Sequence, residues 1–303
     1  MSELRKFVDS LPRPLRRQKL LMALYAMGFV SPVQELEFNS RARAWVDLRD
    51  AESRATYLSK SFWPEIHPIA AAFLRRGGHF FDVGANFGLV TFGVVPLLRG
   101  QGIGFHLFEA NARIVPLLQM SAALWVEEQF TINHCCVTDR PGISRFNLPD
   151  THWGHGRIDE KGEPVPNLML DDYIDERRIE RISFMKVDIE GWEPFALNGA
   201  GRALAAGKVE AAFIELAPAA LRRAGSSADV LLDSLEALGF NCYFCSLYEH
   251  QDAYGLRWIR ADVNGTFLRF ARARPLPATY VQGDVMAIHQ STELGDGLLK
   301  ALS

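Results

Sequence analysis

Acidic residues stand at the ends of four apolar, strand-like runs of this sequence. They are Asp82, Glu109, Asp188 and Glu215. In an open α/β sheet, ligands bind beyond the carboxyl ends of the strands, near the point where the strand order reverses. A carboxylate is rarely buried without a partner, so one such acid would be explained by a helix cap or by solvent. Four of them together favour a shared polar site that binds a ligand.

The first of these strand ends runs directly into a tight turn, in the segment HFFDVGANFG at residues 79–88. Gly84 permits the turn and lets a ligand lie against the backbone. Gly88 lets the next helix pack close to the strand, so that its N-terminal N–H groups face the ligand. The dinucleotide fingerprint G-x-G-x-x-G does not occur in this turn. Asp82 is suited to accept from an ammonium group, such as that of S-adenosylmethionine.

The second strand, GFHLFEA, ends on Glu109. A carboxylate at that position can accept hydrogen bonds from both hydroxyls of a ribose. Dinucleotide folds use an acid at the second strand end for the same purpose, so Glu109 alone does not distinguish between cofactors. The glycine spacing and Asp82 favour S-adenosylmethionine.

Three further acids are candidates for the chemistry itself. Asp188 and Glu190 lie two apart, so in an extended segment they face the same side, and Glu215 closes the next strand. A hydroxyl that attacks an electrophile benefits from a base or a metal ion that lowers its pKa. These acids could therefore act as a base, bind the substrate or hold Mg²⁺. We favour the metal-free alternative, in which Lys186 on the same strand neutralises Asp188.

The segment 148–164, LPDTHWGHGRIDEKGEP, is polar and glycine-rich, and it interrupts the pattern of strands and helices. Long irregular segments of compact domains are often functional. His152 and His155 lie in it, and an imidazole titrates near working pH, so either could act as a general base. We expect this loop to be mobile without substrate and to close over the acceptor.

Short apolar strands alternate with helices from about residue 78 onward. This order predicts an α/β fold with a mostly parallel sheet that helices cover on both faces. The expected strands are 79–83, 103–108, about 131–137, 182–187, 209–216, 240–245 and about 265–270, with an accessory strand at about 143–147. We expect a mainly helical extension over residues 1–75, the main domain over 76–275, and a tail over 276–303 that packs on the domain or is partly mobile.

Composition narrows the classes of function. The chain has 303 residues, 48% of them hydrophobic, and a net charge of −3. A nucleic-acid-binding protein usually carries more basic than acidic residues, so we expect no nucleic-acid partner.

Cys242 and Cys245 form a C-x-x-C inside a strand-like run, and we interpret them as core residues rather than as half of a zinc site. Reduced thiols suit a cytoplasmic protein.

The N-terminal segment 20–30 is apolar, but it is too short to cross a bilayer and no cleavage pattern follows it. We therefore expect neither a transmembrane segment nor a signal peptide. An amphipathic or buried helix is the favoured interpretation, with a helix on a membrane surface as the alternative. Homo-oligomer formation stays open.

Four segments, FFDVGANFG, FHLFEAN, LMLDDYI and FMKVDIEGWEPFALNGA, resemble successive signatures of the FkbM methyltransferase family. The resemblance covers roughly residues 78–245, and the pattern K-x-D-x-E-G-x-E at 186–193 is its most specific part. It implies a Rossmann-like class I methyltransferase with a seven-stranded sheet and S-adenosylmethionine as the cofactor. It further implies O-methylation of a hydroxyl on a sugar, a glycolipid or a polyketide-type small molecule.

The resemblance also implies roles for individual residues. The cofactor would contact Asp82, Gly84, Ala85, Asn86, Gly88, Glu109, Ala110, Asn111, Cys136, Val137 and Asp188. The family often has Pro-Asn after the ribose-binding acid, where this chain has Ala110-Asn111. The segment CVTD at 136–139 also departs from the common form, so the adenine contacts are less strongly implied.

Two alternatives remain from the sequence. One is a relative that binds S-adenosylmethionine without catalysis, although the intact set of Asp82, Gly84, Gly88 and Glu109 favours an enzyme. The other is an N-methylating relative. Such sites often carry an N/D-P-P-Y element, where this chain has Asp-Ile-Glu-Gly at 188–191.

Overall fold

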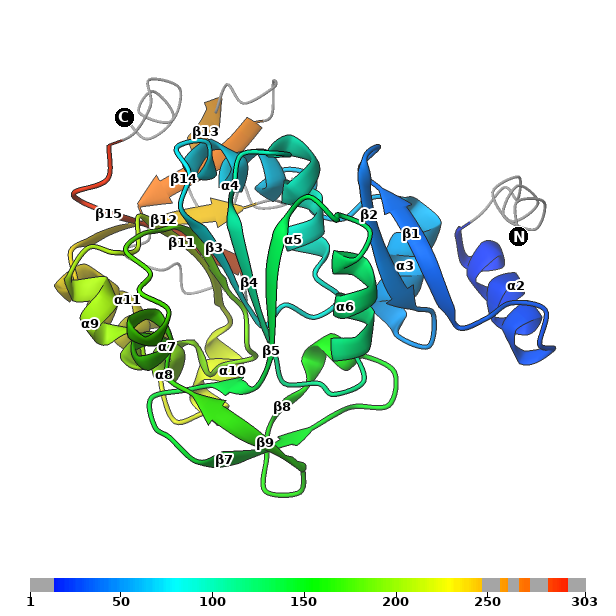
Figure 1. Ribbon diagram of the computed structural model, residues 1–303. Helices are drawn as coiled ribbons and strands as arrows, with labels where there is room; N and C mark the ends of the chain where they lie inside the picture. The colour runs from blue at the N-terminus through cyan, green and yellow to red at the C-terminus, as the bar shows by residue number, and fades with distance from the viewer. Residues whose placement is uncertain (1–13, 247–256, 261–266, 273–282, 294–303) are drawn as a thin grey trace.

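The computed structural model describes residues 14–246, 257–260, 267–272 and 283–293 (Figure 1). Its centre is one large sheet with the strand order β13-β14-β12-β15-β11-β10-β3-β4-β5. Five neighbouring strands run parallel: β5 (Gln129–His134), β4 (Gly104–Glu109), β3 (His79–Val83), β10 (Ile182–Val187) and β11 (Ala211–Leu216). This confirms the predicted α/β fold with a mostly parallel sheet.

The strand order reverses between β3 and β10. The chain proceeds from β3 outward to β4 and β5, then returns to β10 on the other side of β3 and continues to β11. Open α/β sheets bind their ligands at such a reversal. The ends of β3 and β10 therefore lie side by side, with Lys186 paired to Asp82 and Val187 to Val83.

Two of the remaining strands lie close to expected ones, at 240–246 and 267–272, whereas the other two were not predicted. Strand β15 (Gly283–His289) lies between β11 and β12 (Phe240–Ser246), antiparallel to both, although it falls in the stretch predicted to be a tail. Strands β14 (Phe267–Arg272) and β13 (Arg257–Arg260) extend the sheet beyond β12. Local sequence patterns do not distinguish β13, β14 and β15 from one another. Pairing with distant strands decides which of them inserts beside β11.

Each face of the sheet has its own apolar core. Phe80 belongs to the core that includes residues of α4 (Ile66–Leu74), α5 (Leu89–Val94) and α6 (Val115–Ala122). Phe81, one residue later, belongs to the core on the other face, because side chains alternate along a strand. That second core is completed by α7 (Leu170–Glu176), α8 (Glu193–Asn198), α9 (Gly201–Ala205), α10 (Pro218–Arg223) and α11 (Ala228–Ala237).

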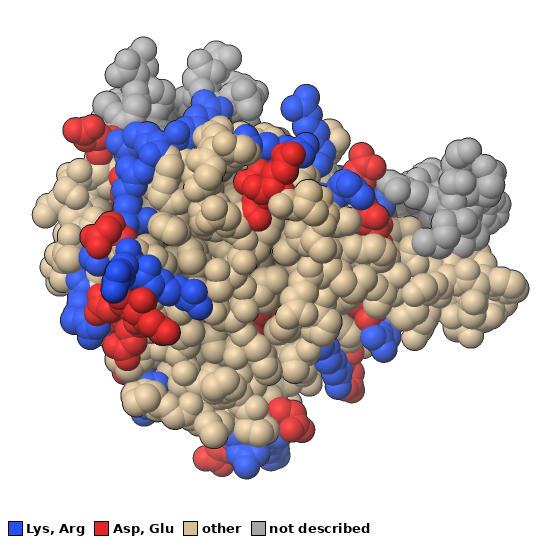
Figure 2. All heavy atoms as spheres, in the orientation of Figure 1, with Lys and Arg blue, Asp and Glu red and all other residues tan. Residues whose placement is uncertain are grey.

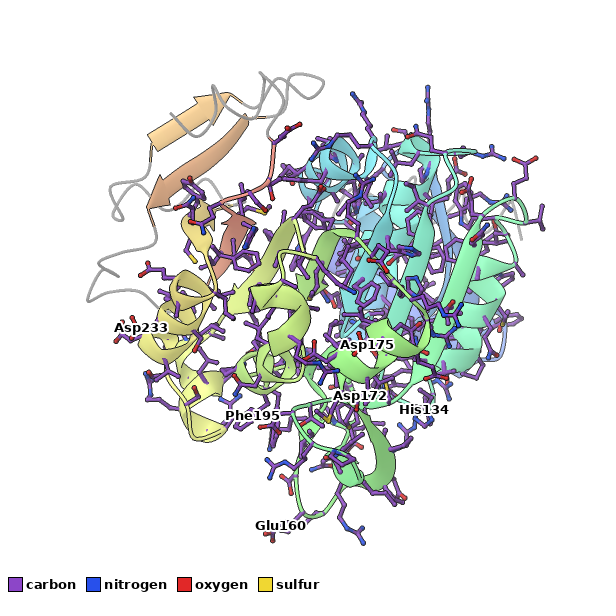
Figure 3. The ribbon with its side chains drawn as sticks, turned by 60° about the vertical axis from the view of Figure 1, so that its left-hand side comes forward. His134, Glu160, Asp172, Asp175, Phe195 and Asp233 are labelled. Atoms are coloured by element: carbon purple, nitrogen blue, oxygen red, sulfur yellow. The ribbon has the colours of Figure 1, made fainter. Side chains whose placement is uncertain are left out.

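Charged side chains lie on the outer surface of these layers. On the face shown in Figure 2, acidic and basic groups lie interspersed, mostly toward the periphery. Asp172 and Asp175 of α7 (Figure 3) both contact the guanidinium group of Arg202 in α9, at 3.4 and 2.7 Å. Pairs this exposed contribute little to stability, so the apolar cores hold these helices in place.

The N-terminal part combines the expected helices with a small sheet. It contains α2 (Pro14–Ala26), the antiparallel pair β1 (Val33–Phe38) and β2 (Ala42–Asp47), and α3 (Ala51–Ser59). The backbone N–H of Trp45 donates to Ser121 Oγ of α6 at 2.7 Å, and Trp125 Nε1 donates to the Arg43 carbonyl. These bonds fix the β1–β2 pair against the domain. Among the described residues, no helix is both long and apolar enough to cross a bilayer.

A second, four-stranded sheet lies below the central one in Figure 1. Its order is β6-β9-β7-β8, formed by β6 (Cys136–Val137), β9 (Glu163–Leu168), β7 (Ile143–Asn147) and β8 (Arg157–Ile158). Glu160 lies at its outer tip (Figure 3). Part of the segment 148–164, expected to be a loop, thus belongs to this sheet or to the 3-10 turn η2 (Trp153–His155).

Candidate active site

The turn after β3 requires a residue without a side chain at position 84. Gly84 has a φ of +75°, and a Cβ on it would lie 1.9 Å from the carbonyl oxygen of Asp188. The backbone N–H groups of Gly84 and Ala85 both donate to the Phe108 carbonyl at 3.0 Å. Gly84 therefore lets the ends of β3, β4 and β10 converge, as the turn prediction requires.

Asp82 lies beneath this turn rather than in an open pocket. Its side chain is 1% exposed, and it accepts a hydrogen bond from Thr91 Oγ1 at 2.6 Å. Burial raises the pKa of Asp82, and the neighbouring Lys186 opposes this shift. The expectation that Asp82 contacts the ligand differs from this geometry, because both of its partners belong to the protein interior.

Lys186 links the two acids at the strand ends. Its Nζ lies 3.6 Å from Asp82 and 3.4 Å from Asp188, and it donates to the Gly84 carbonyl at 2.6 Å. Burial alone would lower the pKa of Lys186, but Asp188 and Asp82 together raise it above its ordinary value. Lys186 is thus the charge partner of Asp188, as predicted.

Glu109 is positioned by two backbone donors. Its Oε2 accepts from the Asn86 N–H and its Oε1 from the Asn111 N–H, both at 2.7 Å. Burial raises its pKa, while these two hydrogen bonds oppose the rise. Asn86 reaches its position through a left-handed backbone, with a φ of 49°. The side chain of Glu109 is thereby held rigidly in the wall of a pocket.

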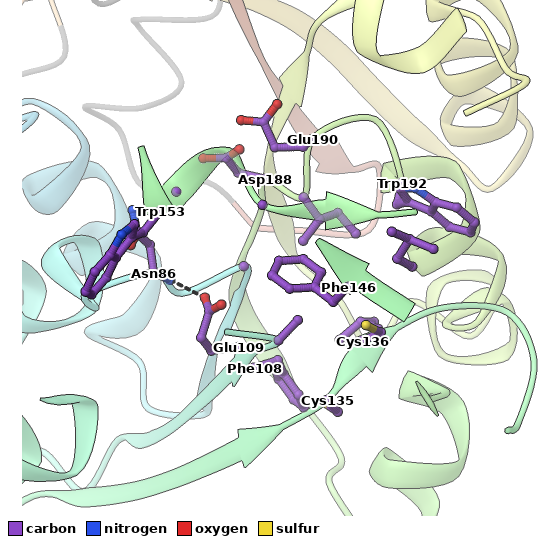
Figure 4. A pocket seen from close by; sticks show the side chains of 17 residues that line it. Asn86, Phe108, Glu109, Cys135, Cys136, Phe146, Trp153, Asp188, Glu190 and Trp192 are labelled. Carbon is purple, nitrogen blue, oxygen red and sulfur yellow. Dashed lines mark hydrogen bonds between the residues drawn. The ribbon is translucent and has the colours of Figure 1, made fainter. Parts of the chain in front are cut away.

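That pocket, called the first pocket below, has a volume of about 560 Å³ when the space open to solvent is included. Figure 4 shows Asn86 and Trp153 on one side, Trp192 and Cys136 on the other, and Asp188 and Glu190 above. The full lining is Gly84, Asn86, Phe108, Glu109, Ala110, Cys135, Cys136, Val137, Phe146, Trp153, Gly154, Gly156, Ile158, Asp188, Ile189, Glu190 and Trp192. Apolar walls with a few fixed polar groups are typical of cofactor sites.

Several residues predicted to contact the cofactor line the first pocket: Gly84, Asn86, Glu109, Ala110, Cys136, Val137 and Asp188. The other four, Asp82, Ala85, Gly88 and Asn111, are not among its lining residues. A Cβ on Gly88 would lie 2.5 Å from the ring of Phe92, so this glycine allows close packing of α5. Sequence reasoning did not assign Phe146 and Ile158 to the site, because only the second sheet brings them there.

The motif K-x-D-x-E-G-x-E shapes the turn after β10. Glu193 is 1% exposed and accepts from the N–H groups of Ile189 and Gly191. Burial raises the pKa of Glu193 to about 7, and these hydrogen bonds oppose the rise. Gly191 is required because a Cβ there would lie 2.5 Å from the backbone of Ala220. The turn so formed directs Glu190 toward the pockets.

A second cavity, called the acidic pocket below, has a volume of about 380 Å³ and opens to solvent. Its lining residues are Glu52, Trp63, Gly84, Asn86, Gly154, His155, Asp188, Glu190, Glu215, Gly283 and Asp284. Five of these also line the first pocket, namely Gly84, Asn86, Gly154, Asp188 and Glu190. The two pockets therefore meet at the reversal of strand order.

Most of the predicted catalytic residues meet in the acidic pocket. Asp188, Glu190, Glu215 and His155 line it, whereas His152 lines neither pocket and contacts Thr151. Glu52 and Asp284 come from outside the expected main domain and were not predicted. Among the described residues, no group of three or more His, Cys, Asp or Glu side chains could hold a metal ion.

The acids of this pocket raise the pKa of one another. Burial, followed by the charge of Asp188, raises the pKa of Glu215 to about 10 and that of Asp284 to about 8. Partial burial at the pocket wall, followed by the charge of Asp50, raises the pKa of Glu52 to about 7. Glu52 nevertheless keeps an exposed surface, so solvent screens it more than the others.

Stability should therefore depend on pH through Asp284. Its carboxyl binds its proton more tightly in the folded chain, so its contribution to stability falls as the pH rises from about 4 to about 8. The nearby charges are Asp188, Glu215 and Lys186. The free energy of unfolding of Asp284→Asn, relative to that of wild type, should therefore be about 1–3 kcal/mol higher at pH 9 than at pH 5. Urea unfolding at both pH values measures this gain, and a pH-independent difference would contradict it.

The segment carrying His155 is fixed to the N-terminal part. The Trp153 N–H donates to Asp50 Oδ1 at 2.9 Å, while Asp50 Oδ2 caps α3 by accepting from the Ser53 N–H. The indole of Trp153 stacks on Phe87, with ring centroids 6.2 Å apart. Asp50 thus couples η2 to the helix that carries Glu52.

Comparisons with known proteins agree with the sequence motifs. The family described as Methyltransferase FkbM domain matches residues 82–242. Among solved structures, the methyltransferase FkbM from Methylobacillus flagellatus KT is 20% identical, with a TM-score of 0.40. That match covers 64% of this chain and 43% of the other, so it spans less than half of that relative. No curated protein matches this chain.

The matches to two other solved structures cover a larger share of those chains. The precorrin-6y C5,15-methyltransferase from Geobacter metallireducens GS-15 is 10% identical, with a TM-score of 0.38, and the match covers 74% of this chain and 88% of that one. The TehB-like SAM-dependent methyltransferase from Corynebacterium glutamicum is 11% identical, with a TM-score of 0.39 and coverages of 79% and 95%.

Proposed function

Because the chain belongs to the FkbM methyltransferase family, we propose that it binds S-adenosylmethionine in the first pocket and methylates a hydroxyl of a small molecule in the acidic pocket. A sugar, a glycolipid or a polyketide-type compound is the expected class of acceptor. The meeting of two pockets at Gly84, Asp188 and Glu190 is the observation that carries this proposal.

The first pocket offers contacts for the ribose, the adenine and the positive end of the cofactor. Glu109 keeps lone pairs beyond its two backbone hydrogen bonds and can accept from the ribose hydroxyls. Cys136, Val137 and Phe146 form an apolar wall for the adenine. The carboxylate of Asp188 at the junction of the pockets can attract the positive end of the cofactor.

When bound, S-adenosylmethionine supplies an activated methyl group on a sulfonium. The acceptor hydroxyl must be held in line with it, and positioning accounts for much of the rate enhancement in such reactions. The hydroxyl proton passes to a base. Glu190, which lines both pockets, and His155, which lines the acidic pocket, are the groups available for this role.

Binding of S-adenosylhomocysteine, the demethylated cofactor, tests the first pocket. In Glu109→Gln, one N–H of Asn86 or Asn111 must face the new amide NH₂ group, and an acceptor for the ribose is lost. We expect the affinity to fall by about 1.5–3 kcal/mol, or roughly 10- to 150-fold, as titration calorimetry would measure.

Glu160→Gln is the matched control, because Glu160 is exposed at the outer tip of the second sheet. Its affinity should equal that of wild type. Equal affinities in all three proteins would remove Glu109 from the cofactor site. Tighter binding of NAD than of S-adenosylhomocysteine would overturn the proposed function.

A further inference from the structure

The acidic pocket gathers carboxylates from three distant parts of the chain. Glu52 comes from α3, Glu215 from the end of β11, and Asp284 from the start of β15. All three line the acidic pocket and are absent from the lining of the first pocket. They therefore lie on the acceptor side, beyond the part of the site that the cofactor would occupy.

Asp284 is the clearest sign that a ligand belongs here. The residue is 8% exposed, lines the pocket, and makes no hydrogen bond or ion pair with the residues that the structure describes. It also lies directly opposite Glu215 on the neighbouring strand, so two carboxyl groups share this end of the sheet. A buried acid without a partner is costly unless something else satisfies it.

Among the described residues, no lysine or arginine lines the acidic pocket, although His155 does. Lys186 is the nearest ammonium group beneath the turn, but it already contacts Asp82, Asp188 and the Gly84 carbonyl. Trp63 lines the same pocket and offers an aromatic surface beside the acids. Carboxylates combined with an aromatic face are the groups that recognise an organic ammonium ion.

We infer that the acidic pocket binds a protonated amine of the acceptor, so that the acceptor is a hydroxylated organic cation such as an amino sugar or an amino alcohol. This inference rests on the proposed function and names its substrate class. The same carboxylates direct the reaction to oxygen, because an ammonium group that they hold protonated has no lone pair to attack the methyl group. The hydroxyl is then the nucleophile.

The size of the pocket agrees with an organic ligand. The cavity volume is about 380 Å³, within the range of small-molecule sites, and the acids come from separate elements of the chain. Among the described residues, these acids do not lie close enough together to form a metal-binding site. An extended cation with charges several bonds apart can contact carboxylates that do not converge on a single point.

The test uses the full-length protein saturated with S-adenosylhomocysteine, and the probe is the trication spermidine. A titration with S-adenosylhomocysteine comes first, because failure at that step contradicts the proposed function itself. Spermidine is then titrated at low salt, beside N1,N8-diacetylspermidine, which keeps one of the three charges. We expect saturable binding of spermidine to wild type, and binding at least tenfold weaker for the diacetylated compound.

Variants locate the binding site. Asp284→Asn and Glu52→Gln should each weaken spermidine binding about tenfold, whereas Glu160→Gln, far from the pocket, should bind like wild type. If wild type binds S-adenosylhomocysteine but not spermidine, or if all three variants bind spermidine equally, the cationic acceptor is overturned while the proposed function stands. Displacement of spermidine by equimolar Mg²⁺ would replace the inference with a metal site.

Discussion

Replacing Lys186 with methionine is expected to lower the free energy of unfolding by about 3–5 kcal/mol, because it leaves two acids without their shared counter-charge. Lys186 is 5% exposed and lies within 3.6 Å of both Asp82 and Asp188. Asp82 is almost completely buried, and Thr91 Oγ1 would remain as its hydrogen-bond donor. Urea unfolding of wild type and Lys186→Met measures the loss.

The loss should also depend on pH. Without Lys186, the pKa of Asp82 rises further above its unfolded value, so the variant loses additional stability as the pH increases through that range. The deficit should therefore be larger at pH 8 than at pH 5. Lys161→Met, at an exposed position of the second sheet, is the control and should unfold like wild type. A deficit that is equal at both pH values would mean that Lys186 acts through packing rather than charge.

Gly84→Ala is expected to have the second large effect, on stability and on cofactor binding together. The new Cβ would lie 1.9 Å from the carbonyl oxygen of Asp188, and the φ of +75° is itself unfavourable for alanine. Left-handed backbone costs about 1–2 kcal/mol, and forced overpacking adds about 1–3 kcal/mol. Because β3 and β10 must separate to relieve the contact, binding of S-adenosylhomocysteine should also become undetectable.

Gly100→Ala separates the two causes. Gly100 has a φ of +71°, close to that of Gly84, but a Cβ there would meet nothing within 4 Å. It should therefore lose about 1–2 kcal/mol from backbone strain alone and bind the cofactor product normally. Thermal unfolding and calorimetry of the pair measure both effects. If Gly84→Ala lost no more stability than Gly100→Ala and still bound, the close approach of the two strand ends would not be needed.

Local patterns in the sequence predicted a large part of this molecule. Alternating strands and helices indicated the α/β fold, and the glycine spacing around Gly84 located the turn at the strand reversal. The pairing of Lys186 with Asp188 was also predictable, since residues two apart on a strand share a face. These features depend on neighbours in the chain, so spacing and residue type are enough to determine them.

Other features depended on which distant segments meet. Asp82 was expected to face a ligand, but the register of β3 with β10 places Lys186 beside it in the interior. His152 and His155 looked equivalent in sequence, and only the turn η2, held by Asp50, brings His155 alone to the pocket. Glu52 likewise enters from the N-terminal part.

The clearest example is Asp284. It lies in a stretch expected to be a tail, yet β15 inserts between β11 and β12 and places its carboxylate opposite Glu215. No local signal distinguishes a strand that joins a sheet edge from one that inserts into its middle, because pairing energy is shared with residues far away in the chain. The sequence by itself therefore determined the turn after β3 and the acid at the end of β4, while tertiary structure decided which acids line the acidic pocket.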